Sequence, residues 1–387
     1  MFTPSKRSAI SPFLAMDVLR DANAAEQQGR SVVHLEVGQP GAPAPKPVLE
    51  AARRCLETGR LGYTDALGIR DLRERIAQHY AEQYGVTVPA DWVVVTTGSS
   101  GGFNLAFLAA FDVGDKVGLP TPGYPAYRNI LAALGIEVVD IETTAADRWT
   151  LTEDNIRAAH AEHGLAGVLV ASPANPSGTM LTPDALQAVC RTCDELGIGF
   201  ISDEIYHGLT YEGDAHSALQ YSDHVIVINS FSKYYCMTGW RIGWMILPEH
   251  MVRPVECLAQ NLFISSPELS QRAALAAFDA RDELEEIKRG YARNREILTN
   301  GLRDMGLDEF LPVDGAFYVY VNCRKFTNDT VDFCRRMLAE TGVATTPGAD
   351  FDPERGHQYM RLSFAGTQSD MKEALARMAA WLPTQQS

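Results

Sequence analysis

Short apolar runs alternate with longer amphipathic stretches through the middle of the chain, and this alternation constrains the fold more than any other feature. The apolar runs are rich in Val and Ile and cover 92–96, 116–119, 167–171, 199–202 and 225–228. Helical patterns lie between most of them, at 102–111, 124–134 and 183–196. Strands that alternate with helices predict an α/β fold with a mostly parallel sheet, covered by helices on both faces.

The two ends of the chain differ from this middle part. Residues 1–45 indicate an arm with one helix at 12–28, and a long charged helix follows residue 282. A strand-like run at 317–321 and a last helix complete the chain. We therefore expect three regions: an arm that joins the small domain (1–45), a large domain (46–282) and a small α+β domain (283–387).

Unusual loops follow five of the strands, where ligands bind in open parallel sheets. These loops supply glycines with hydroxyls, a tyrosine, an amide, a carboxylate and a lysine, and they are 97–102, 120–124, 172–178, 203–206 and 229–233. The first, with Gly98-Ser-Ser-Gly-Gly102, presents backbone amides at a helix start and suits a phosphate monoester. Taken alone, it is equally typical of a tight turn.

Asp203 and Lys233 are the two charged residues that follow apolar strands. A carboxylate at such a strand end needs a cationic partner. Asp203 with Glu204 would also fit a magnesium site of the Walker B type, but no phosphate loop with its lysine is present. A lone lysine is usually solvated, yet desolvation and a nearby cation such as Arg241 would make Lys233 a nucleophile able to form an imine.

Composition excludes several partners. Lys and Arg total 34 against 49 Asp and Glu, a net charge of −15, so we expect no nucleic-acid partner. Seven scattered cysteines indicate a reducing, cytoplasmic location, and Cys190 with Cys193 is predicted to be a pair of core thiols rather than a metal site. We expect no signal peptide and no membrane span, which needs roughly 18–20 apolar residues.

Residues 229–243, NSFSKYYCMTGWRIG, resemble the lysine signature of the class I/II pyridoxal-phosphate aminotransferases, which have the aspartate-aminotransferase-like fold type I. Four more blocks resemble that family in its order and extend the likeness over nearly the whole chain: 63–68 (YTDALG), 172–179 (SPANPSGT), 203–206 (DEIY) and 360–364 (MRLSF). The cofactor implied is pyridoxal 5'-phosphate.

The resemblance implies a role for individual residues. Lys233 would hold the cofactor as an aldimine, Asp203 would pair with the pyridinium nitrogen, and Asn175 and Tyr206 would bond the phenolic oxygen. Tyr124 would stack on the ring. The phosphate would be held by Ser99, Ser100, Gly101, Ser230, Ser232 and Arg241, with Tyr63 reaching it from the partner subunit of a homodimer. The α-carboxylate of the substrate would bind Arg361, the Gly38 backbone and Asn175.

We therefore expect an aminotransferase that moves the amino group of an L-amino acid to a 2-oxo acid, with Lys233, Asp203 and Tyr206 as its catalytic residues. A β-lyase or racemase on the same scaffold is the alternative, and a non-catalytic or regulatory binding protein is a weaker one. The pathway and the exact substrates are left open. No second pocket arginine can be assigned, which argues against aspartate and leaves glutamate or alanine as donors. Phe13, Tyr63 and Phe263 are candidates for an apolar pocket side.

Overall fold

The computed structural model describes residues 1–59 and 61–385, and its centre is a seven-stranded sheet. The strand order is β2-β8-β7-β6-β5-β3-β4, and only β8 runs antiparallel to its neighbours. The bounds are β2 (Val93–Thr96), β8 (Gly243–Ile246), β7 (Ile226–Ser230), β6 (Gly199–Asp203), β5 (Gly167–Ala171), β3 (Lys116–Thr121) and β4 (Glu137–Glu142). The expected α/β class with a mostly parallel sheet is confirmed.

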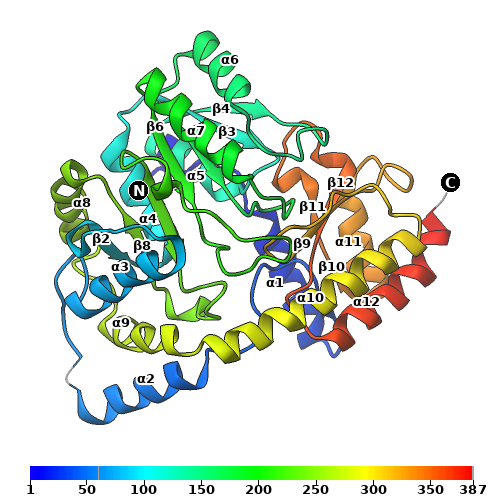
Figure 1. Cartoon of the computed structure of the whole chain (residues 1–387). Helices are drawn as coiled ribbons and strands as arrows, with labels where there is room; N and C mark the ends of the chain where they lie inside the picture. The colour runs from blue at the N-terminus through cyan, green and yellow to red at the C-terminus, as the bar shows by residue number, and fades with distance from the viewer. Residues whose placement is uncertain (60, 386–387) are drawn as a thin grey trace.

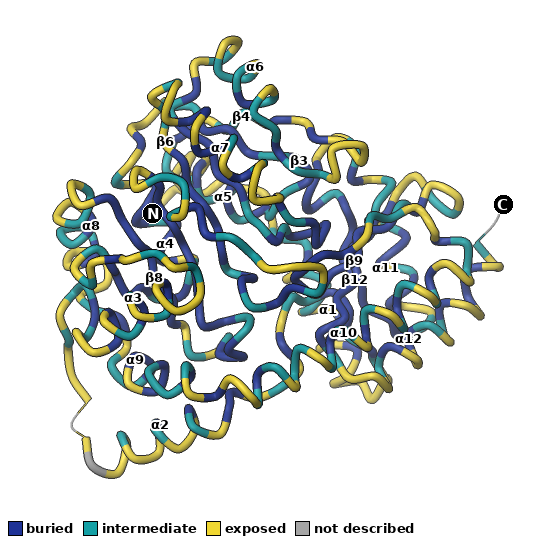
Figure 2. Tube along the Cα trace, viewed as in Figure 1, coloured by how far each residue is buried: buried dark blue, intermediate teal, exposed yellow. Residues whose placement is uncertain are grey.

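Helices cover both faces of this sheet, because alternate strand residues point to opposite sides. Val93 and Val95 pack with one group of helices, and Val94 packs with the other. The first group is α2 (Lys46–Thr58), α3 (Arg70–Tyr84), α6 (Glu153–His163), α7 (Pro183–Leu196) and α9 (Glu268–Leu275). The second group is α4 (Gly98–Ala110), α5 (Pro125–Leu134) and α8 (Glu249–Leu262). Buried residues accordingly concentrate along the strands (Figure 2).

A second core lies around a smaller sheet. β9 (Tyr318–Asn322), β12 (Tyr359–Ser363) and β11 (Thr346–Pro347) form an antiparallel sheet, and β1 (Val33–His34) pairs in parallel with β10 (Val343–Ala344). The helices of this part are α1 (Leu14–Gln27), α11 (Thr330–Thr341) and α12 (Gln368–Trp381). The N-terminal arm thus packs against the C-terminal part of the chain.

One long helix, α10 (Arg281–Asp304), joins the two cores. Leu284 packs in the core of the large sheet, whereas Leu298 and Leu302 pack in the second core. Figure 1 shows α10 running along one edge of the molecule and beside α12. The helix therefore fixes the position of one core against the other, while the domain boundaries at residues 45 and 282 stay predictions.

The sequence pattern placed one boundary wrongly at a functional position. Residues 98–101 were expected to form a loop before a helix at 102–111, but they are the first turn of α4. Gly98 has a φ of +70°, a left-handed conformation that glycine adopts without steric cost, and this lets β2 turn almost directly into the helix. The amides of the predicted loop are consequently the free N–H groups of a helix N-terminus.

Candidate active site

A pocket lies between the two cores, at the carboxyl ends of the parallel strands. Most of the residues singled out from the sequence line it, namely Gly38, Ser99, Ser100, Tyr124, Asn175, Asp203, Tyr206, Ser232, Lys233, Arg241 and Arg361. Gly101 and Ser230 lie behind this lining: a Cβ on Gly101 would meet Thr97, and the Ser230 hydroxyl lies 2.9 Å from that of Ser232. Tyr63 lies outside the pocket and is 82% exposed.

Lys233 lies partly buried in this pocket. Its Nζ donates a hydrogen bond to the Gly38 carbonyl at 2.5 Å, and the rings of Tyr206 and Phe317 each lie 5.9 Å away. Burial, reinforced by Arg361 and Arg241, lowers the pKa of Lys233 to about 8. The neutral amine, which is the nucleophilic form, is therefore populated at mildly alkaline pH.

Asp203 ends β6 with its carboxylate buried at 3% exposure. Its Oδ1 accepts the Ile205 backbone N–H at 3.0 Å, and its Oδ2 accepts the Tyr127 hydroxyl. Burial raises the pKa of Asp203 to about 6, while the bonds from Tyr127 and Ile205 oppose that rise. A cation placed beside this carboxylate would keep it ionised.

The N-terminus of α4 is a candidate anion site. No side chain caps this end through a hydrogen bond, and no acidic residue lies in its first turn, so the first amides are available to an anion. A Cβ on Gly98 would lie 2.5 Å from Nη2 of Arg241, so only glycine lets the guanidinium approach the helix start. Arg241 is itself held by a 2.9 Å bond to the Thr238 carbonyl. Amides, guanidinium and serines together match a phosphate group.

Arg361 is a buried cation on the opposite side of the pocket, only 2% exposed. Its guanidinium lies between the rings of Tyr318 and Phe351, at 4.4 and 4.7 Å. Nη1 donates to Asn175 Oδ1 at 2.9 Å, and Nη2 donates to the Glu36 carbonyl and to Thr346. Nε has no partner among the residues that the structure describes.

Tyr206 and Tyr318 face each other in the pocket with their hydroxyls 2.8 Å apart. The Tyr318 hydroxyl also touches Gly38, because a Cβ built there would lie 1.8 Å from it. Glycine at position 38 thus allows the segment that bonds Lys233 to lie directly against Tyr318.

The residues present fit pyridoxal 5'-phosphate, the cofactor that the resemblance implies. The Gly98 cradle at the free end of α4 suits its phosphate, buried Asp203 suits a protonated ring nitrogen, and Lys233 suits its aldehyde. Ser99, Ser100, Ser232 and Arg241 would hold the phosphate. Asn175 Nδ2 and the Tyr206 hydroxyl are donors of the pocket lining that would bond the phenolic oxygen of the ring.

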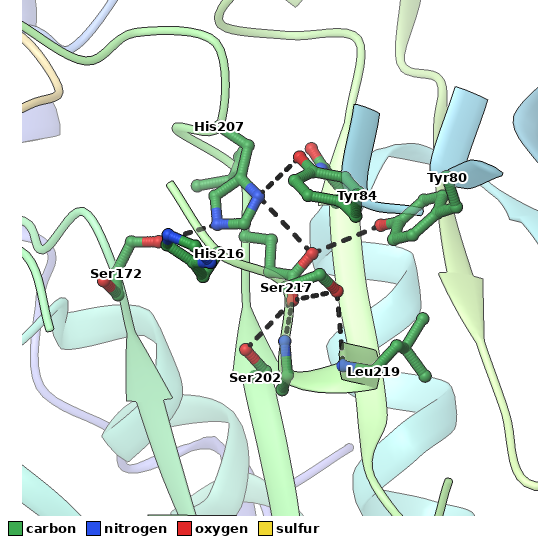
Figure 3. Close-up of polar contacts among 12 residues, drawn as sticks. Tyr80, Tyr84, Ser172, Ser202, His207, His216, Ser217 and Leu219 are labelled. Atoms are coloured by element: carbon green, nitrogen blue, oxygen red, sulfur yellow. Dashed lines mark hydrogen bonds and ion pairs between the residues drawn. The ribbon is translucent and has the colours of Figure 1, made fainter. Parts of the chain in front are cut away.

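A second buried carboxylate, Glu204, follows Asp203 and lies beside His207, which bonds the loop that carries Asn175. Glu204 accepts bonds from the Ser217 hydroxyl at 2.9 Å and the Ala218 amide at 3.0 Å. His207 Nδ1 lies 3.5 Å from the Glu204 carboxylate and 2.8 Å from the Tyr84 hydroxyl. Figure 3 shows His207 between Tyr84 and Ser172, whose carbonyl accepts from Nε2 at 3.1 Å. Nε2 therefore carries the proton, and Nδ1 accepts from Tyr84.

This network gives a pH-dependent stability. Burial raises the pKa of Glu204 to about 8 and lowers that of His207 from 6.5 to about 3. A raised carboxyl pKa stabilises the fold at low pH and loses this effect as pH rises towards 8, whereas His207 acts in the opposite sense only below pH 6.5. Between pH 6.5 and 8 we expect wild type to lose up to about 1.4 kcal/mol per pH unit relative to Glu204→Gln. Urea midpoints of both proteins across this range measure it, and equal slopes would contradict the assignment.

The structure also describes the cysteines, possible metal groups and helices of the chain. Cys190 and Cys193 are buried core thiols of α7, and all seven cysteines are free. Among the described residues no group of three or more His, Cys, Asp or Glu is placed to hold a metal. Arg128, which is absent from the pocket lining, pairs with Asp140 at 2.6 Å. In the part of the chain that is described, no helix has the length and apolar character to cross a membrane.

Several pocket residues were not foreseen from the sequence. Tyr127, Tyr318, Met16 and Val37 line the pocket beside the predicted residues, and Phe13 lines it as expected. Phe263 does not reach the lining and is 37% exposed. Asp350 accepts the amides of Leu14 and Ala15 at 2.9 and 3.1 Å, which holds the start of α1 over the pocket.

Comparison with protein families gives a match to the family described as aminotransferase class I and II over residues 30–378. The valine–pyruvate aminotransferase of Mycobacterium tuberculosis is 49% identical over 383 residues, which is 98% of each chain. The (5-formylfuran-3-yl)methyl phosphate transaminase of Methanocaldococcus jannaschii is 35% identical over 375 residues, 96% of each chain.

Solved structures give the same likeness. An aminotransferase from Mycobacterium tuberculosis superposes with a TM-score of 0.97 at 48% identity and covers 100% of both chains. The aspartate aminotransferase of Thermus thermophilus with maleate has a TM-score of 0.93 at 32% identity, over 98% of this chain and 100% of that one. The likeness therefore includes both the smaller sheet and the large one.

Proposed function

The chain belongs to aminotransferase class I and II, and from this we propose that it takes its amino group from a small aliphatic amino acid and passes it to pyruvate or a similar 2-oxo acid. The chain is a pyridoxal-phosphate-dependent aminotransferase of fold type I, as the sequence resemblance implied. The observation that carries the substrate side of the proposal is Arg361, a buried cation with an unpartnered Nε in the pocket. Such a group suits an α-carboxylate.

The residue roles follow from charge and position. The cofactor, when bound, withdraws electrons from the bond between Cα and its hydrogen. Arg361 and Asn175 would hold the carboxylate, and the lowered pKa of Lys233 would let Nζ take the proton from Cα. Asp203 would hold a proton on the ring nitrogen, and Tyr206 would donate to the ring's oxygen.

The proposed aliphatic preference rests on the pocket side formed by Phe13, Met16 and Val37. Lys233, Arg241 and Arg361 are the cations among the described lining residues, and each has a role in the scheme above. An acidic side chain would therefore lie against this apolar side without a cationic partner from the described residues. The valine–pyruvate relative supports this choice, whereas relatives named aspartate aminotransferases are 28–32% identical.

Steady-state kinetics with single donors tests this preference. We expect kcat/KM for valine or alanine to exceed that for aspartate by at least about 100-fold, because the charged aspartate side chain would meet an apolar pocket side without a cationic partner. Met16→Arg, which adds a cation beside the pocket, should raise the aspartate-to-valine ratio, while the matched control Met16→Leu should not. A wild type that prefers aspartate or glutamate would refute the aliphatic assignment.

We also propose a homodimer with shared active sites. Tyr63 is exposed in the single chain, and its loop bonds to Ser265 through the Thr64 amide at 3.3 Å. Leu262, Phe263 and Ile264 next to Ser265 are exposed apolar residues, which supports a subunit contact at this surface. Tyr63 would then reach the phosphate of the partner's site. A cytoplasmic location is proposed in addition, supported by the seven free thiols.

A further inference from the structure

Tyr127 is a pocket residue to which no role has yet been given. Its hydroxyl donates to Asp203 Oδ2, and the other carboxylate oxygen, Oδ1, is taken by the Ile205 amide. Tyr127 is only 5% exposed. Both oxygens of Asp203 therefore already accept a hydrogen bond from a donor that burial keeps in place.

The ring of Tyr127 is held firmly. It packs edge-on against Phe103 at 4.9 Å and against Tyr124 at 5.2 Å, so helices α4 and α5 both fix it. Burial and the adjacent carboxylate of Asp203 raise the pKa of Tyr127 far above its ordinary value. The phenol thus keeps its proton, and it meets Asp203 as a donor only.

A hydrogen-bond donor to the Asp203 carboxylate would affect the position of the proton between this carboxylate and a pyridine nitrogen. When a carboxyl group and a pyridine nitrogen face each other, they share one proton, which lies on either the oxygen or the nitrogen. Each hydrogen bond to the carboxylate stabilises its charged form and moves that proton towards the nitrogen. Burial of Asp203 acts in the opposite direction, because it favours the neutral acid.

We propose that Tyr127 is a positioning residue that, through its hydrogen bond to Asp203, keeps the shared proton on the ring nitrogen of the bound cofactor. The inference rests on the proposed pairing of Asp203 with that nitrogen. Tyr127 itself touches neither the substrate nor the reacting bond; it acts through Asp203. The protonated ring is the form that draws electrons from the substrate.

Tyr127→Phe tests this directly, because it removes the donor and keeps the ring packing. The holoenzyme is prepared with cofactor labelled with ¹⁵N in the ring, and the nitrogen signal is recorded by NMR. We expect the signal to move towards that of an unprotonated pyridine, kcat to fall about 10- to 100-fold, and KM for the amino acid to change less than about two-fold.

Tyr320→Phe is the matched control. Tyr320 is also buried, at 4% exposure, and its hydroxyl has no partner among the described residues. Its loss should leave the nitrogen signal and kcat unchanged. An unchanged nitrogen signal in Tyr127→Phe overturns the proposal and leaves Tyr127 a packing residue.

Asp203→Asn tests the proposed pairing of Asp203 with the ring nitrogen separately from the role of Tyr127. If Asp203→Asn shifts the nitrogen signal and Tyr127→Phe does not, only the inference fails; if neither shifts it, the pairing of Asp203 with the ring fails. If Tyr127→Phe does not fold, 3-fluorotyrosine at position 127 keeps the shape and makes a stronger donor. The signal should then move further towards protonated nitrogen, and no movement, or the reverse, overturns the proposal.

Discussion

Lys233→Ala should lower transamination with any donor by at least about 10⁴-fold. In the proposed scheme, the variant would lose both the group that bonds the cofactor and the amine that takes the Cα proton. When an amino acid is added, the absorption spectrum of the variant should lack the shift that the cofactor shows in the wild-type protein. Added methylamine should restore part of the activity, since a small amine can occupy the space that the side chain leaves.

Stability provides the control for this variant. Lys233 is partly buried, and desolvation lowers its pKa to about 8, so the charged lysine costs free energy in the fold at neutral pH. The cofactor-free Lys233→Ala protein should therefore unfold at the same temperature as wild type or higher. Lys288→Ala, which changes a lysine 3.8 Å from Glu285 in α10, should keep full activity. Substantial activity in Lys233→Ala without added amine would refute the role of Lys233.

Arg361→Ala should reduce kcat/KM for the amino acid and for the 2-oxo acid by at least about 100-fold, because truncating one partner of a buried charge pair costs about 2–5 kcal/mol. Arg361→Lys keeps the charge but loses the planar fork that bonds Asn175 and Glu36, so a loss of about 10-fold or more remains expected. Stopped-flow absorbance of the cofactor, titrated with each substrate, measures the binding and chemical steps.

The affinity for the cofactor distinguishes a specific loss of substrate binding in the Arg361 variants from general damage to the pocket. Arg361 lies across the pocket from the anion site at α4, so the affinity for the cofactor should stay within about two-fold of wild type in both variants. Arg355→Lys alters an arginine that bonds Asp352 and Glu142 outside the pocket, and it should leave kcat/KM unchanged. Equal kcat/KM in wild type and Arg361→Ala would remove Arg361 from the substrate site.

The elements that the sequence predicted best are those with clear local boundaries. The strand at 167–171 and the helix at 183–196 occur at those residues as β5 and α7. Pro183 at the first helical turn, the Thr182 cap and left-handed Gly197 mark the two ends of α7 locally. Strand β4 was missed, because this edge strand, Glu137–Glu142, mixes acidic with apolar residues and is only partly buried.

The candidate site divides in the same way. Asp203 ends the apolar strand β6 and Lys233 comes shortly after β7, so their place at the carboxyl edge of the sheet could be predicted. Tyr127 could also have been predicted as a pocket residue. It lies three residues after Tyr124 in a predicted helix, and this spacing puts the two side chains on one face. The hydrogen-bond partners of Arg361 could not be predicted from the sequence. The Glu36 carbonyl and Thr346 come from distant segments and meet only when the second core forms.

The stretch from Glu36 to Gly38 has a consequence for altering the enzyme's selectivity. Its two outer residues serve Arg361 and Lys233 through main-chain oxygens, while the Val37 side chain lines the pocket between them. A library that varies Val37 would reshape the cavity without deleting either hydrogen-bond acceptor. Selection for new donors is therefore best started there, where side-chain identity and backbone chemistry are separable.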